Sequence, residues 1–317
     1  MAKKTASKTI KKQNKHMTRR IILLLCLGIT LGRLQAQELY IFTEPASNMA
    51  ANSIGLRLNT EAMPMRHGKA LAYRLNPEVM WGVNKNFMVH AGAYMGDMFQ
   101  PQWRFEGASL YAKYRFLSLD DVHKHFRMAA FGRLAISRNP AQLHYTTTHL
   151  QTNTDGTTVV HTLHKKLQAD ELALNGNNSG AQVGVVATQL LHKLALSTSA
   201  GYIMRMNNVN AKPIGNATDG NWQATLSAGY LLLPKTYRSY KQTNLNLYCE
   251  ALAQKATGGA GYFVDVAPGI QFIFNSISRL DLGYRFQAAG NMSRYNSKLV
   301  LLRFEYNFFN VRQPKAS

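Results

Sequence analysis

The feature that most constrains this chain is the strict alternation of apolar and polar side chains over long runs. Within residues 298–309, the positions from 302 to 308 are alternately apolar and polar. The apolar set is Leu302, Phe304, Tyr306 and Phe308, and the polar set is Arg303, Glu305 and Asn307. Successive side chains of a β-strand point to opposite faces, so this strand has one aromatic face and one charged face. A barrel with lipid outside and a polar lumen inside has that pattern.

Alternation with period two recurs along the chain and predicts twelve strands. They cover residues 53–60, 69–81, 87–95, 104–116, 125–137, 180–190, 193–206, 222–233, 244–255, 262–274, 279–289 and 298–309. Most of these runs are longer than the ~5–6 residues that are commonest in globular strands. Their length fits the ~9–11 residues with which a tilted strand crosses a membrane.

The connections between these runs alternate in length. Mostly short turns follow the even-numbered strands and mostly longer polar segments follow the odd-numbered ones, of which residues 138–179 are the longest. Outer-membrane barrels have short periplasmic turns and longer external loops. The prediction is an all-β, transmembrane, antiparallel up-and-down β-barrel of about twelve strands, closed because lipid leaves no edge unpaired. A soluble sandwich or lipocalin-like barrel with the faces exchanged is the alternative.

The N-terminus is typical of a secretory signal. Residues 1–20 carry eight Lys and Arg and no acid, residues 21–31 are apolar, and Leu34-Gln35-Ala36 forms a cleavage motif before Gln37. This predicts a cleaved signal peptide over residues 1–36 and export to the outer membrane. It also predicts a periplasmic segment over 37–52, the barrel over 53–309 with an external loop at 138–179, and a periplasmic tail over 310–317. Translation starts at Met1 or Met17.

Net charge is partly an effect of this signal. The formal charge is +21, but residues 1–36 hold nine of the 37 Lys and Arg and none of the 16 Asp and Glu, which leaves +12. The remaining basic residues are spread along strand-like runs and form no nucleic-acid motif, so no nucleic-acid partner is expected. Outer-membrane lipid and anionic lipopolysaccharide are the partners that suit such a surface.

Three segments carry a resemblance to a known class. They are Leu34-Gln-Ala-Gln37, the stretch Glu38-Leu-Tyr-Ile-Phe-Thr-Glu-Pro-Ala-Ser-Asn-Met49, and the aromatic last strand. With them the chain resembles the single-chain outer-membrane β-barrels of Gram-negative bacteria, and is similar to an uncharacterised porin- or transporter-like group of the Bacteroidetes. The resemblance implies that barrel-assembly machinery reads the end of the last strand. Here Phe308 and Phe309 match that signal, although residues 310–317 follow them.

The inward face of the predicted barrel carries most of its charge. By alternation the lumen is lined by Arg57, Arg74, Lys113, Arg115, Arg127, Arg133, Glu250, Asp265, Asp281, Arg285, Arg303 and Glu305. Eight cations against four carboxylates would favour anions if water fills the lumen. The alternative is a lumen closed by paired salt bridges, because a narrow barrel is easily filled by large side chains.

Aromatic residues gather near the predicted strand ends, where amphipathic rings favour the membrane interface. The set is Trp81, Tyr94, Trp103, Phe116, Tyr202, Tyr230, Phe274, Tyr306 and Phe308. Packing in the core of a soluble barrel is the alternative for them.

Methionine and histidine recur in the predicted external loops, which suggests a copper-like metal site. Thioether and imidazole ligands suit copper(I), since soft sulfur selects soft cations. The candidate ligands are Met63, Met65, His67, His144, His149, His161 and His164. Ordinary packing is the alternative for methionine.

Catalysis finds no support in the sequence. Nucleophilic catalysis needs a nucleophile, a base and an orienting group within hydrogen-bond reach, and no histidine of this chain lies in such a motif. We expect no catalytic residue, no cofactor and no enzyme activity. The predicted function is passive or facilitated passage of a small solute, with a lean to anions. The alternative is a structural or ligand-binding surface barrel whose outer loops bind a ligand such as a metal ion.

Overall fold

The computed structural model describes residues 40–65, 71–121, 124–154, 158–213, 218–236, 239, 241–259 and 261–311, apart from the side chains of His149 and His161. The predicted signal peptide lies outside these residues. The strands are β1 (Ser53–Pro64), β2 (Leu71–Gly82), β3 (Phe87–Gly96), β4 (Arg104–Asp120), β5 (Lys124–Ser137), β6 (Leu143–Thr152), β7 (Thr158–Leu167), β8 (Ser179–Leu191), β9 (Leu194–Met206), β10 (Gly220–Leu233), β11 (Asn244–Ala256), β12 (Tyr262–Phe274), β13 (Ser278–Gly290) and β14 (Lys298–Phe308).

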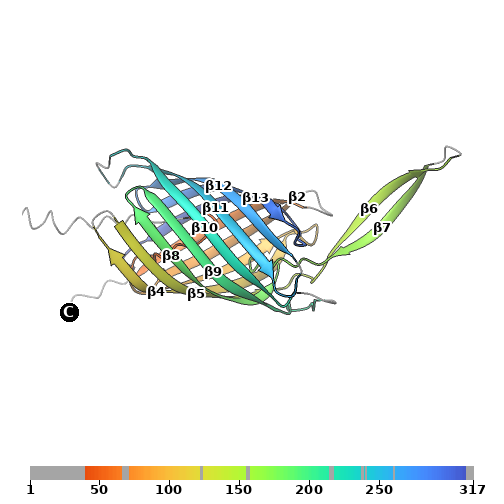
Figure 1. Cartoon of the computed structure of the whole chain (residues 1–317), viewed down its shortest axis with the longest axis horizontal. Coiled ribbons are helices and arrows are strands. Elements are labelled where there is room, and N and C mark those ends of the chain that lie inside the picture. Colours follow the sequence, from red (N-terminus) through yellow and green to blue (C-terminus); the bar gives the residue numbers. More distant parts are fainter. Residues whose placement is uncertain are drawn as a thin grey trace, which may run out of the picture. The chain divides into compact units, whose positions relative to one another are not determined.

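Twelve of these strands close into one antiparallel barrel, in the order β1-β14-β13-β12-β11-β10-β9-β8-β5-β4-β3-β2 (Figure 1). Each strand pairs with its neighbours along the chain, except that β5 pairs with β8. The first and last strands form the closing seam, paired from Ile54↔Phe308 to Ala62↔Val300. The predicted all-β, twelve-stranded up-and-down barrel is confirmed.

The strands β6 and β7 lie in the long connection after β5 and pair only with each other. Figure 1 shows this hairpin as a separate two-stranded sheet outside the barrel wall. The rest of that connection, residues 168–178, packs back against the barrel. Ala169 joins a buried cluster with Met63 of β1, and Leu172 joins another with Ile203 of β9.

The two faces of the barrel wall differ as alternation predicts. On β13, Leu282 is 49% exposed and its neighbour Asp281 is fully buried. On β14, Phe304 is 49% exposed and Glu305 is buried. A wall with apolar side chains outside and charged ones inside is the arrangement of a barrel surrounded by lipid. Within the described ranges, no helix is long and apolar enough to cross a membrane.

One β-bulge reverses the alternation on β4. The register of β3 and β4 shifts between Tyr94 and Met95, and the bulge leaves both Glu106 and Gly107 buried while Phe105 is exposed. A bulge inserts one residue into a strand and so moves the following side chains to the other face. Simple alternation from Lys113 places Glu106 outside, whereas the structure turns it into the lumen.

Tyr94 corrects one of the aromatic predictions. The sequence places it at the membrane interface, but its side chain is 1% exposed and its hydroxyl lies 2.7 Å from that of Ser109. Tyr94 is inside because it shares the inward face of β3 with the buried His90. Tyr202 is partly buried against Trp222, with ring centroids 4.9 Å apart. The other seven rings are exposed: Trp81, Trp103, Phe116, Tyr230, Phe274, Tyr306 and Phe308. Their place at a lipid interface stays a prediction.

Candidate functional site in the barrel lumen

The segment before β1, residues 40–52, enters the barrel lumen. Its main anchor is Glu250 of β11, which accepts hydrogen bonds from the backbone N–H groups of Ile41 (2.8 Å), Phe42 (2.8 Å) and Thr43 (3.0 Å), and from the Thr43 hydroxyl (2.7 Å). Hydrogen bonds to an ionised acceptor are roughly twice as strong as neutral ones. Such bonds also offset the cost of burying the Glu250 carboxylate, which is fully buried.

Two glycines make room for this segment on the wall beside Glu250. Gly269 of β12 and Gly283 of β13 are directly paired. A Cβ atom on Gly283 would lie 2.7 Å from Cε2 of Phe42, and one on Gly269 would collide with Ile41. Any side chain here would therefore displace the segment. The wall and the segment fit each other only because both positions are glycine.

The opposite wall holds the segment through cations. The Lys113 ammonium of β4 donates to the carbonyl oxygens of Pro45 (2.6 Å) and Ser47 (2.8 Å). Arg127 of β5 donates to the Ser47 hydroxyl at 2.8 Å. On β8, the Thr188 hydroxyl accepts from the backbone N–H of Ala46 at 2.8 Å. Residues 41–47 thus bridge walls on opposite sides of the barrel and cross its lumen. The sequence predicts a periplasmic segment over residues 37–52, of which 37–39 lie outside the described residues.

Glu44 connects the segment to the closing seam. Its carboxylate lies 2.8 Å from Nη1 of Arg57 on β1, and the same guanidinium binds Glu305 of β14 at 2.8 Å and Glu78 of β2 at 3.2 Å. Burial alone would raise the pKa of Glu44, but Arg57, with His90 and Lys113, holds that pKa well below its usual range. Glu44 is therefore a carboxylate at neutral pH.

We expect acid to loosen the segment through Glu44. A carboxyl group whose pKa is lowered on folding stabilises the folded arrangement above its unfolded pKa, roughly 4.3 for glutamate, and this contribution is lost as the pH falls through the folded pKa. Proteolysis of residues 40–52 in the inserted barrel should therefore be constant from about pH 7 to 5 and faster below about pH 4. In Glu44→Gln the segment should be more accessible already at pH 7, with a smaller acid step. An equal acid step in both proteins would contradict a role for Glu44.

The connection after β7 is fastened to charged side chains at the other end of the lumen. Arg294, in the β13–β14 connection, donates to Glu171 (2.9 and 3.0 Å) and to Asp265 of β12 (2.7 and 2.9 Å). Burial would lower the pKa of Arg294, but Glu171 and Asp265 raise it, so this guanidinium stays charged. Arg285 of β13 adds a 2.5 Å bond to Asp265. This group of four charges fastens residues 168–178 to the barrel mouth.

A second contact of the same connection is made by Arg74 of β2. Its Nε donates to Glu106 at 2.6 Å and its Nη2 donates to Oδ1 of Asn177 at 2.7 Å. Both charged side chains are almost completely buried. Removing one partner of a buried ion pair is strongly destabilising, because the other charge is then left without compensation. The bulge that turns Glu106 inward is therefore what allows Arg74 to sit there.

The structure buries nine of the twelve predicted lumen charges, and it partly buries Arg115, Arg133 and Arg285. Sequence reasoning missed seven more charged residues that face them. These are Glu44, Glu61, Glu78, Glu106, Glu171, Arg279 and Arg294. The additional residues are two cations and five carboxylates, so the inward excess of four positive charges nearly vanishes.

The predicted metal ligands that the structure describes lie in two places, at the end of β1 and on the β6–β7 hairpin. Met63 is buried in an apolar cluster against which Met65 also packs. His144 and His164 are on the β6–β7 hairpin, whose register pairs the backbones of His149 and His161. His67 lies outside the described residues. Within the described part of the chain, no group of three or more His, Cys, Asp or Glu could hold a metal ion. The copper-like site stays a prediction.

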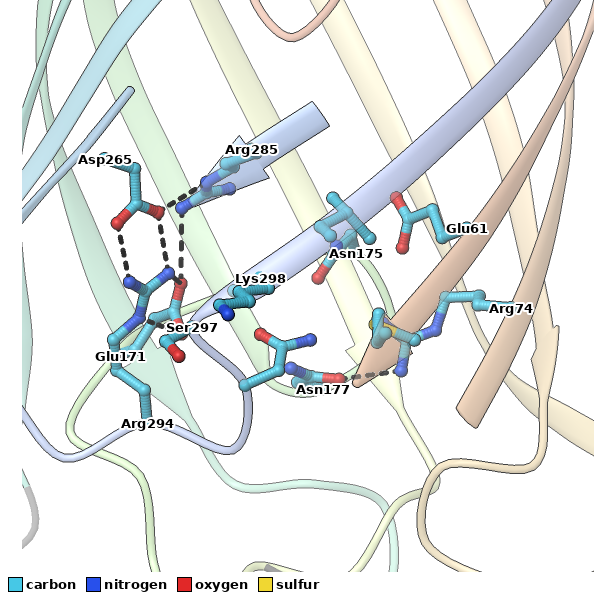
Figure 2. A pocket seen from close by; sticks show the side chains of 14 residues that line it. Glu61, Arg74, Glu171, Asn175, Asn177, Asp265, Arg285, Arg294, Ser297 and Lys298 are labelled. Atoms are coloured by element: carbon cyan, nitrogen blue, oxygen red, sulfur yellow. Dashed lines mark hydrogen bonds and ion pairs between the residues drawn. The ribbon is translucent and has the colours of Figure 1, made fainter. Parts of the chain in front are cut away.

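At the barrel mouth, a polar pocket lies between the four-charge group around Arg294 and the contacts made by Arg74 (Figure 2). It is lined by β1, β2, β12, β13 and β14, and by the connections that contain Glu171 and Arg294. Its cavity volume is about 40 Å³. On the same measure one water molecule needs roughly 10–15 Å³, so the pocket has room for more than one water molecule. In Figure 2 the four-charge group lies on one side, and Glu61, Arg74, Asn175 and Asn177 lie on the other.

Comparison with known proteins supports the fold. No protein-family model and no curated protein matches the sequence. Among solved structures, an outer membrane channel from Pseudomonas putida F1 matches with a TM-score of 0.50 and 10% identity over 85% of this chain and 100% of that one. This chain shares its barrel fold. The KdgM porin matches with a TM-score of 0.44 and 10% identity over 80% of this chain and 99% of that one. The CymD monoaromatic hydrocarbon channel matches with a TM-score of 0.41 and 9% identity over 83% of this chain and 90% of that one.

Proposed function

We propose that this chain is an outer-membrane channel for a small solute, and that its N-terminal segment holds it closed in the described state. The observation that carries the proposal is the way in which that segment is bound inside the barrel. It crosses the lumen, its backbone is held by Glu250, and two paired glycines leave room for it. A barrel with a purely structural role needs no fitted segment of this kind.

The location rests on three features. The outer wall is apolar where the strands cross, as lipid requires. The sequence begins with the pattern of a secretory signal. The barrel fold is that of an outer membrane channel from Pseudomonas putida F1. With the short turns on the periplasmic side, the N-terminal segment enters from the periplasm and residues 168–178 lie at the outer mouth.

Charge pairing changes the expected selectivity. The cations that the sequence assigns to an anion-favouring lumen bind carboxylates at hydrogen-bond distance, as Arg57 does with Glu44 and Glu305 and Arg74 does with Glu106. Their fields largely cancel, which removes the physical reason for a strong anion preference. We propose passage of small polar solutes without strong selection by charge sign.

Liposome swelling tests this function. Vesicles with the intact barrel should show little or no swelling in small sugars and amino acids, because the segment closes the lumen. Vesicles with a variant that lacks residues 40–48 should swell much faster. The largest solute that still causes swelling then measures the opening left at the mouth. The matched control is deletion of residues 144–166, which removes most of the hairpin outside the barrel wall and leaves the lumen unchanged. If neither the intact barrel nor the lumen deletion passes any solute, the chain is not a channel.

A ligand-binding surface barrel is the second candidate, and the β6–β7 hairpin favours it. The hairpin is a separate sheet that carries exposed apolar side chains, Leu150 at 72% and Val160 at 58%, directly opposite each other. If the chain is a ligand-binding surface barrel, removal of residues 144–166 should abolish ligand binding. If it is a channel, the same deletion should leave liposome swelling unchanged.

A further inference from the structure

The pocket at the mouth has hydrogen-bonding capacity on one wall only. On the side of Arg294, each charged group already has partners: Arg294 binds Glu171 and Asp265 through all three of its nitrogens, and Arg285 binds Asp265. This wall is electrically satisfied and offers little to a ligand.

The other wall carries buried polar atoms that are not satisfied. Among the described residues, no hydrogen-bond partner reaches Nη1 of Arg74, Oε2 of Glu61 or Oδ1 of Asn175, and all three atoms are buried. The Arg74 side chain itself is only 1% exposed. Glu61 and Arg74 are directly paired across β1 and β2, and Figure 2 shows both side chains on the same side of the pocket as Asn175. Most buried polar groups in proteins have partners, so three orphaned atoms around one cavity indicate an occupant.

The chemistry of these atoms defines that occupant. Arg74 Nη1 is a cationic donor, and Lys298, which is exposed at the edge of the pocket, supplies a second. Glu61 and Asn175 supply two acceptors, one of them anionic. Guanidinium and ammonium groups bind carboxylates, while a carboxylate and an amide oxygen bind an ammonium group. The pocket therefore presents complementary groups for both ends of one small dipolar molecule.

We propose that this pocket binds a small zwitterion that carries an ammonium group and a carboxylate, of the size of a free α-amino acid. The ligand's carboxylate lies between Arg74 and Lys298, and its ammonium group lies between Glu61 and Asn175. This site rests on the proposed function, because it lies on the path of a solute through the outer mouth. It adds a substrate class to that function.

Calorimetric titration of the purified barrel with glycine tests the site. Acetate and methylammonium, which each carry one half of the zwitterion, are the matched ligands. Glycine should bind, and each half should bind at least ~10-fold more weakly, since a hydrogen bond to a charged group contributes about that factor. Glu61→Gln should weaken glycine binding by ~10-fold or more, and Lys298→Ala, at an exposed position that folding tolerates, by about 3–10-fold. Lys255→Ala is the control, because this exposed lysine of β11 does not line the pocket and should leave binding unchanged.

The outcomes separate this site from the channel function. No heat with glycine means that water alone fills the pocket, and the zwitterion site is then wrong even if the barrel passes solutes. Equal binding of glycine in wild type, Glu61→Gln and Lys298→Ala also overturns it. Glycine binding that both variants weaken, in a barrel that stays sealed without residues 40–48, supports the site and contradicts the channel.

Discussion

Glu250→Gln should convert the barrel from sealed to conducting in a planar lipid bilayer. The carboxylate accepts three backbone N–H groups and one hydroxyl from residues 41–43. A glutamine amide keeps only one acceptor oxygen, so its NH₂ group must face donors that then lose their partner. Hydrogen bonds to a charged group contribute about 1.5–3 kcal/mol each. The loss of two such bonds should raise the population of barrels with a displaced segment by roughly 100-fold or more.

Asp281→Asn is the control for this experiment. Asp281 of β13 is an inward and fully buried carboxylate, but its described contacts are with Arg279 and Arg303 and not with residues 40–52. It should perturb the lumen without opening it. Gly283→Val should displace the same segment by steric overlap, because a side chain at this position collides with Phe42. A bilayer that stays sealed with both Glu250→Gln and Gly283→Val would contradict a removable segment.

Leu282→Arg should be among the most damaging single changes on the outside of the barrel. Leu282 lies in the middle of β13 and is 49% exposed on the outer wall. If that wall faces hydrocarbon, arginine near mid-depth costs about 2–4 kcal/mol of unfolding free energy. Urea titration of the barrel in lipid vesicles, followed by its heat-modifiable migration in gels, measures this loss.

Leu150→Arg is the matched control for the membrane test. It is the same substitution at a more exposed leucine, 72% exposed on the β6–β7 hairpin outside the barrel wall. In water a surface change of this kind stays within about 0.5 kcal/mol. Equal and small effects of the two substitutions would mean that the outer wall faces water and that the soluble alternative is correct.

The barrel was predictable because its signal is repeated. Alternation depends only on the geometry of a strand, so each of the twelve runs indicates a two-faced strand independently of the others. The bounds were less accurate: β1 was expected to end at residue 60 and continues to Pro64, and β4 continues to Asp120. Strand ends depend on pairing with a neighbour, which a single strand's pattern does not contain.

The missed site residues fall into three kinds. Glu78 was within reach, because it shares the alternating face of Arg74 and Asn76 inside a predicted strand. Glu44, Glu171 and Arg294 carry no periodicity, since they lie in irregular segments whose positions are set by partners on distant strands. Glu106 follows from a bulge, and alternation alone assigns it to the wrong face. The lumen wall could therefore be read from the sequence, but what fills the lumen could not.

The shared guanidinium of Arg57 has a consequence for assembly. Arg57 sits on the first strand, and it binds Glu305 on the last strand and Glu44 on the segment that crosses the interior. Glu305 comes alongside Arg57 only when the ends of the sheet meet. The guanidinium of Arg57 therefore joins both ends of the sheet and the interior segment at one point. Removal of any one of these three groups leaves buried charge on the others uncompensated, so we expect closure of the barrel and docking of the segment to be energetically coupled.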